Sequence, residues 1–81
     1  MPHKLPQVSG QSIVKLLKRY GYEVVRQRGS HIHLRKNDAA GQHSITVPDH
    51  HTLAKGTLDD ILNKISLVNN IPKQDLIDLL S

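Results

Sequence analysis

The sequence predicts a small α+β domain in which a three-stranded antiparallel sheet carries its helices on one face, in the order α-β-β-β-α-α. Two stretches, residues 9–20 and 57–68, repeat apolar residues at the i, i+3, i+4, i+7 spacing of one helical face. Between them lie three short runs rich in β-branched residues, separated by turn residues. Strands joined by such short turns form an antiparallel meander that leaves one face available to helices.

The first helix is expected to begin after Ser9, whose side chain can cap it, and to end before Gly21. Residues 1–8 contain Pro2 and Pro6, which discourage regular structure, so this segment is expected to be an N-terminal arm. The apolar side of the helix consists of Ile13, Leu16, Leu17 and Tyr20. This side should pack against the sheet.

The three strands are expected at residues 22–28, 31–36 and 43–47. Gly29 joins the first two because glycine tolerates a positive φ, residues 37–41 supply the next turn, and Pro48 ends the third strand. Alternate side chains of a strand share a face. The core face should therefore carry Ile32, Leu34, Ile45 and Val47.

A second helix is expected to begin at Thr57, a good N-cap, and to place Asp59 and Asp60 in its first turn, where the helix dipole favours anions. The Asn-Asn pair at residues 69–70 interrupts it, and Pro72 opens a short third helix. The apolar side of the second helix consists of Leu58, Ile61, Leu62 and Ile65. The third helix is too short to be stable alone, so its apolar residues should dock onto the core: Leu76, Ile77, Leu79 and Leu80.

The chain has 81 residues and 37% hydrophobic content, which suits one small domain over residues 9–81 with little room for a deep pocket. A ligand is therefore expected to bind across its surface. The absence of cysteine excludes disulfides, thiolate metal sites and cysteine nucleophiles, and it fits a reducing cytoplasm. No apolar run reaches the length of a membrane span and no signal-peptide pattern follows Met1, so a soluble, cytoplasmic protein without membrane contact is expected.

The positive charge is concentrated in the first half of the chain. Residues 1–36 carry eight lysines and arginines against one glutamate, whereas residues 37–81 carry three lysines and six aspartates. A basic half of this kind is typical of a surface that binds a polyanion, although an ordinary solvated helix face explains part of it. The six histidines show no i, i+4 pair on a helix and no cysteine accompanies them, so no metal or other cofactor is expected.

Residues 26–36 combine basic and titratable side chains around a turn at Gly29. In the strand after the turn, His31, His33 and Arg35 share the face opposite the apolar one. Histidine changes its charge near neutral pH, so His31 among arginines offers both a base and positive charge to a phosphodiester. An exposed strand histidine is usually only a solvated residue, and cationic strand residues also serve to block sheet edges, so the spacing alone leaves both interpretations open.

Three motifs follow one another along the chain: Val-Val-Arg-Gln-Arg-Gly-Ser-His at residues 24–31, Ile-Thr-Val-Pro at residues 45–48 and Lys-Gly-Thr-Leu-Asp-Asp-Ile-Leu at residues 55–62. With them, the chain resembles the HicA toxins of HicAB toxin–antitoxin systems over about residues 9–80. The resemblance implies a fold like the double-stranded-RNA-binding domain, cleavage of mRNA without a metal, and a HicB-type antitoxin that covers the active face. The catalytic histidine of the family corresponds to His31.

Cleaving RNA without a metal requires a base for the 2′-hydroxyl, a cation for the phosphorus centre and a proton for the leaving oxygen. His31 is the expected base. The turn at Gly29 lets backbone approach the substrate, the guanidinium groups suit phosphate oxygens, and Lys36 adds a point charge. His33 lies about 7 Å from His31 between Cβ atoms, so an RNA contact or a bystander is favoured over an acid. The candidate substrate-binding residues are Arg28, Gly29, Ser30, His33, Arg35 and Lys36.

The partners expected from the resemblance are mRNA and a HicB-type antitoxin, with a monomer when the toxin is free and a hetero-oligomer in the complex. A second function stays open, that of a non-catalytic RNA-binding module that uses the same basic face. Aromatic content is 2% and Phe and Trp are absent, so such a module would contact backbone and 2′-hydroxyls rather than stack bases on its sheet. A purely structural protein would leave the arginine and histidine face unexplained.

Overall fold

The computed structural model describes residues 5–39 and 41–80. Its elements follow the order α-β-β-β-α-α, which confirms the predicted α+β class. They are α1 (Gly10–Arg19), β1 (Glu23–Arg28), β2 (His31–Asp38), β3 (Gly41–Pro48), α2 (Lys55–Asn69) and α3 (Lys73–Leu80). No helix in these ranges is long and apolar enough to cross a membrane.

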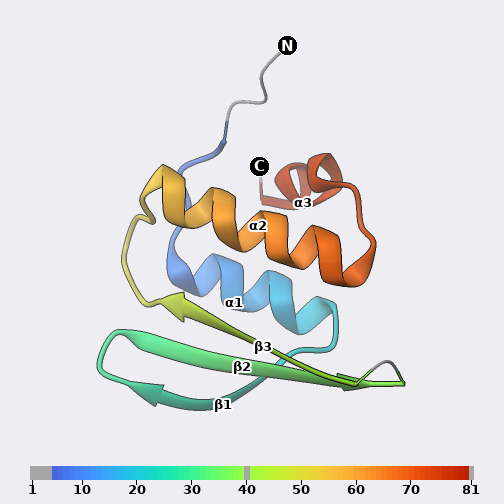
Figure 1. Ribbon diagram of the computed structural model, residues 1–81. Coiled ribbons are helices and arrows are strands. Elements are labelled where there is room, and N and C mark those ends of the chain that lie inside the picture. Colours follow the sequence, from blue (N-terminus) through green and yellow to red (C-terminus); the bar gives the residue numbers. More distant parts are fainter. Residues whose placement is uncertain (1–4, 40, 81) are drawn as a thin grey trace.

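The three strands form one antiparallel sheet in the order β1-β2-β3, and the helices lie on one side of it (Figure 1). In β2, Ile32 and Leu34 face the helices, opposite Val47 and Ile45 of β3. Ile32 is only 2% exposed, whereas its neighbour His31 is exposed, which confirms the predicted alternation. The side of the sheet that carries no helix is the open face.

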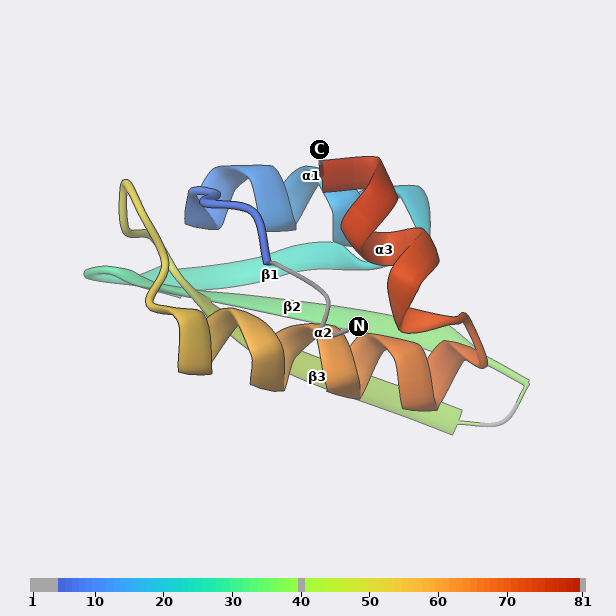
Figure 2. The ribbon, with the colours of Figure 1, turned by 90° about the horizontal axis from the view of Figure 1, so that it is seen from above.

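The core lies between the sheet and the helices, and α3 packs against both α1 and α2 (Figure 2). Burying one aliphatic side chain contributes about 1.5–3 kcal/mol, so this apolar cluster is the main source of stability. The side chains that are at most 1% exposed include Ile13, Leu17, Leu34, Leu58, Leu62, Ile65 and Leu76.

The segment expected to be an N-terminal arm is described from Leu5 onward, because residues 1–4 lie outside the described residues. Residues 5–9 form no helix or strand. Val8 nevertheless packs into the core at 9% exposure, and its carbonyl accepts a hydrogen bond from the Leu53 N–H at 2.8 Å. The end of this segment is therefore part of the packed domain.

Helix α1 begins and ends with the signals that the sequence predicts. The Ser9 hydroxyl accepts a hydrogen bond from the Ser12 N–H at 3.1 Å. At the other end, Gly21 has a φ of 91° and the Tyr22 N–H donates to the Leu17 carbonyl at 3.1 Å, which closes a Schellman motif. These bonds satisfy backbone groups that helix ends otherwise leave unpaired.

Gly10, the first residue of α1, lies directly against the end of β3. A Cβ at this position would lie 2.0 Å from the Pro48 carbonyl oxygen, so only glycine permits the approach. The Gly10 N–H also donates to the His50 carbonyl at 2.9 Å. This contact fixes the segment that follows β3 against the start of α1.

Helix α2 begins earlier than the sequence predicts, and its N-cap lies three residues before the predicted one. Its first residue is Lys55, Ala54 occupies the N-cap position without a side-chain hydrogen bond, and Thr57 lies inside the helix. The Leu58 N–H donates to the Ala54 carbonyl at 2.9 Å, which closes the first turn there. The prediction that Thr57 caps the helix is wrong, because the buried Leu53 already fixes the chain in front of Ala54.

Two other boundaries differ from the sequence-based expectation. Because α2 begins earlier, Asp59 and Asp60 lie beyond its first turn. The hairpin between β2 and β3 is longer than predicted, since pairing continues to Asp38 and Gly41. Ala40, in the expected turn, lies outside the described residues.

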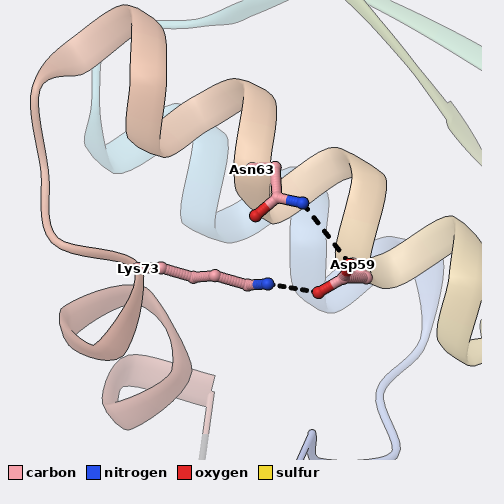
Figure 3. Close-up of polar contacts among 3 residues, drawn as sticks. All are labelled: Asp59, Asn63 and Lys73. Atoms are coloured by element: carbon pink, nitrogen blue, oxygen red, sulfur yellow. Dashed lines mark hydrogen bonds and ion pairs between the residues drawn. The ribbon is translucent and has the colours of Figure 1, made fainter. Parts of the chain in front are cut away.

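Helix α3 docks on the core through Leu76 and Ile77, which are 0% and 4% exposed, as predicted. The predicted docking of Leu79 is wrong, because this side chain is 43% exposed and does not belong to the core cluster. Figure 3 shows the ion pair between Lys73 of α3 and Asp59 of α2. Exposed pairs of this kind contribute about 0–1 kcal/mol, so apolar contacts hold α3 in place.

Candidate active site

A two-residue turn joins β1 to β2 and carries the Gly-Ser-His motif. Arg28 and His31 are cross-strand partners, which leaves Gly29 and Ser30 as the loop. Gly29 has a φ of 55°, as the first loop residue of a type II′ turn requires. A Cβ on Gly29 would meet no atom within 4 Å, so the turn projects into open space and a ligand can approach its backbone.

Asp49, the residue directly after β3, supports this turn from the side. Its N–H donates to the Ser30 carbonyl at 2.5 Å. Its carboxylate accepts hydrogen bonds from the side-chain amides of Gln11 and Gln27, at 3.0 Å and 3.3 Å. The Gln27 amide also donates to the Gly29 carbonyl at 3.1 Å. Both loop carbonyls are therefore bonded, which limits the movement of the residue that follows them.

The open face carries His31, as the alternation predicts, together with His33 and Arg35. Arg28 and Arg26 of β1 stand opposite His31 and His33, and cross-strand partners share a face. The His31 ring is exposed and forms no hydrogen bond within residues 5–39 and 41–80. It is therefore accessible to a ligand from solvent.

Acidic side chains do not neutralise the arginines of the open face. Among the residues described here, the only ion pair joins Lys73 to Asp59, on the helix side of the sheet. Glu23 is the cross-strand partner of Arg35, yet the two side chains form no ion pair. Exposed guanidinium groups suit phosphate oxygens, and three are presented on this face, those of Arg26, Arg28 and Arg35.

His33 is half-buried, and its Nδ1 is hydrogen-bonded to Thr46 Oγ1 at 3.0 Å. Thr46 is its cross-strand partner on β3. The bond leaves Nε2 as the ring nitrogen that is available to a ligand. His31 and His33 are successive residues of one strand face, about 7 Å apart between Cβ atoms, so they suit neighbouring positions along a substrate.

Lys36 does not join the open face. It lies half-buried on the helix side of β2, where its Nζ donates to Asn69 Oδ1 at 2.5 Å. Its Nζ also lies 5.7 Å from the centre of the Tyr22 ring. The alternation that turns Ile32 and Leu34 toward the helices turns Lys36 the same way. The structure thus separates Lys36 from the other candidate substrate-binding residues.

Tyr22 is the centre of a polar cluster that the sequence does not reveal. The side chain is 2% exposed, and its hydroxyl is hydrogen-bonded to His43 Nδ1 at 3.0 Å and accepts from Asn69 Nδ2 at 3.2 Å. A buried tyrosine hydroxyl requires such partners. The cluster has no local sequence signal, because Tyr22, Lys36, His43 and Asn69 come from four separate segments.

The sequence also does not assign a contact to Asp49 or Arg26. Asp49 reaches the turn only because pairing of β2 with β3 brings Pro48 opposite His31. Arg26 stands opposite His33 because the β1–β2 register shifts after Val24. The available signals were the charge of Arg26 and the position of Asp49 after a strand-ending proline, and neither identifies a contact.

The five histidines in the described part of the chain do not converge on one site. His31 and His33 lie on the open face, His43 contacts Tyr22, and His50 and His51 follow β3. In the part of the chain that the structure describes, no three His, Cys, Asp or Glu side chains come together in a way that could hold a metal ion.

A protein-family model matches the chain over residues 10–67, which is more than half of its length. That model describes the HicA toxin of bacterial toxin–antitoxin systems. The chain belongs to the HicA toxin family. No curated protein and no solved structure gives a significant match.

The HicA match runs from the start of α1 into α2 and contains the Gly-Ser-His turn, the open face and Asp49. Helix α3 lies beyond it. Membership of this family makes the chain the toxin of a toxin–antitoxin pair, and it implies an antitoxin as a partner.

Proposed function

We propose that this HicA toxin is an endoribonuclease that cleaves mRNA without a metal ion, with His31 as the general base. The observation that carries the proposal is the exposed His31 ring, which directly follows an open turn and stands opposite Arg28. A base and a cation are thus available to one phosphodiester on a surface that RNA can reach. Family membership supports the toxin role but leaves the reaction to this proposal.

In the proposed reaction, His31 takes the proton of the 2′-hydroxyl and the 2′-oxygen attacks the adjacent phosphorus. The bond between phosphorus and the 5′-oxygen breaks, and that oxygen leaves with a proton from water. The products are a 2′,3′-cyclic phosphate and a 5′-hydroxyl. The Arg28 guanidinium stabilises the negative charge that builds on the phosphorus-bound oxygens.

The remaining substrate contacts follow from the same surface. The open turn supports backbone contacts at Gly29 and Ser30, where no side chain of Gly29 blocks the approach. His33 and Arg35 lie farther along β2 and are assigned to substrate binding. Lys36 is left out of this role because it bonds to Asn69 on the helix side.

The antitoxin is proposed to be HicB-type and to cover the open face. An acidic or hydrogen-bonding surface would match the arginines there and would deny RNA access to His31 without any distant conformational signal. The toxin is proposed to be a cytoplasmic monomer when free, with residues 9–81 as a single domain, and a hetero-oligomer in the complex. Hydrogen exchange of the complex should protect the β1–β2 hairpin, and protection confined to α3 would contradict this arrangement.

Incubation of the purified toxin with RNA in a chelator tests the reaction. Cleavage should persist, the new 3′ ends should be 2′,3′-cyclic phosphates, and 2′-O-methyl RNA of the same sequence should stay intact because it has no 2′-hydroxyl to activate. Loss of cleavage in the chelator would contradict the metal-independent mechanism. RNA binding without cleavage at any pH would favour the non-catalytic RNA-binding module instead.

A further inference from the structure

Strand β1 contains a bulge on the open face. Pairing with β2 steps from Val24 opposite Leu34 to Arg26 opposite His33, which leaves Val25 without a partner. Val25 is 46% exposed although it is apolar. Bulges often redirect a side chain beside a binding site, and here the bulge brings Arg26 next to His33.

A shallow groove of about 410 Å³ lies beside this bulge on the open face. The backbone of Leu34 and Ile45 forms its floor, because the side chains of these two residues are buried on the other side of the sheet. The side chains that line the groove are Val25, Arg26, His33, Arg35, Ser44 and Thr46. Apart from Val25, they are all cationic, titratable or hydroxyl-bearing groups. This composition suits a ligand with an anionic part and a hydroxylated part.

The two arginines of the groove are free to bind an anion. Neither Arg26 nor Arg35 forms an ion pair with any described acidic residue, including Glu23, which stands opposite Arg35. His33 adds a hydrogen-bonding nitrogen, because Thr46 occupies Nδ1 and holds the ring with Nε2 available. A phosphate that accepts hydrogen bonds from guanidinium groups is the expected occupant.

We propose that this groove binds the nucleotide next to the scissile one in single-stranded RNA, with its phosphate at Arg26 and Arg35 and its ribose or base edge against Val25. The proposal rests on the proposed function of His31 as the general base. His31 precedes His33 by about 7 Å on the same strand face, so a phosphate beside His33 is the neighbour of the phosphate beside His31. A nucleotide whose base edge reaches Val25 must be unpaired, because a duplex shields its bases. No Phe, Tyr or Trp side chain lines the groove, so recognition rests mainly on phosphate and ribose and tolerates different bases.

A 2′-O-methyl hexanucleotide of mixed sequence, which cannot be cleaved, is the probe for this site. Its dissociation constant is measured with the wild type and with Arg26→Gln and Arg35→Gln. Lys18→Gln is the matched control, because it removes the same charge from an exposed position of α1 on the helix side. Each arginine substitution should weaken binding about tenfold and flatten the salt dependence by about one unit. Lys18→Gln should leave both unchanged.

The same samples separate this proposal from the ribonuclease proposal. Wild-type affinity in both arginine variants would overturn the groove, whatever the cleavage assay shows. Tighter binding of a duplex than of the single strand would also overturn it. If the arginine substitutions weaken binding but the wild type does not cleave the corresponding 2′-hydroxyl RNA, the groove proposal is supported and the ribonuclease proposal is contradicted. Amide spectra of labelled toxin should show shifts at Arg26, His33 and Thr46 on binding, and shifts confined to α1 would contradict the assignment.

Discussion

The backbone N–H of Asp49 donates to the carbonyl of Ser30 at 2.5 Å, which joins the end of β3 to the turn before His31. The Asp49 carboxylate is held in turn by Gln11 of α1 and Gln27 of β1. Three elements thus meet at one residue beside the proposed base. Asp49 does not need to touch RNA to matter, because it positions the turn that carries His31.

The first prediction concerns this positioning role. Asp49→Ala should lower kcat at least about tenfold, because small displacements of a catalytic group are costly, while KM changes little. The free energy of unfolding should fall by only about 1 kcal/mol, since the lost hydrogen bonds are exposed. Asp60→Ala is the control, as it removes the same charge from an exposed position of α2. An unchanged kcat in Asp49→Ala would show that the turn holds its geometry without this side chain.

The second prediction contrasts two glycines within helices. Gly10→Ala should lower the free energy of unfolding by about 1–3 kcal/mol, because its Cβ would overlap the Pro48 carbonyl. Gly56→Ala should raise it by about 0.5–1 kcal/mol, because that position is helical and faces open space. Denaturant titration of both variants measures the difference. Equal effects of the two substitutions would argue against the close contact between α1 and β3.

The third prediction separates two cations that have the same formal charge but different positions. Arg28→Ala should flatten the slope of log RNA affinity against log salt by about one unit, because it removes one phosphate contact. Lys36→Ala should leave the slope unchanged and lower the free energy of unfolding by about 1–3 kcal/mol, since Asn69 loses its bonded partner. Titrations at several salt concentrations measure both. If Lys36→Ala also flattened the slope of log affinity against log salt, Lys36 would have to contact RNA, which would contradict its assignment to the helix side.

The local elements were predictable from sequence because their signals are local. Ser9 caps the start of α1 with its side chain, and Gly21 ends the helix because glycine tolerates a positive φ. The alternation in β2 places Ile32 and His31 on opposite faces of the sheet. The N-cap prediction at Thr57 was wrong because a helix does not require a capping side chain when a buried residue, here Leu53, fixes the chain before it.

The candidate site was predictable in its centre and not in its surroundings. The motif itself locates His31, but the contact of Asp49 with Ser30 and the bulge beside Arg26 depend on how distant strands pair. Lys36 was grouped with the basic residues for its charge, whereas its position in the alternation already turned it toward the helices. The positive charge of this stretch indicated a function, but the pairing of the strands determines which of its side chains lie on the same surface.

The most direct test of the account measures single-turnover cleavage and RNA affinity on the same preparations of the wild type, His31→Ala and His31→Gln. Gln42→Ala is the control for an exposed strand residue away from the turn. Cleavage by both His31 variants should fall about 100- to 10,000-fold, the usual contribution of a general base. Their stability should stay within about 0.5 kcal/mol of the wild type because His31 is exposed, and RNA affinity should persist because the arginines remain. Cleavage at the wild-type rate by His31→Ala would contradict the account and move the active site elsewhere.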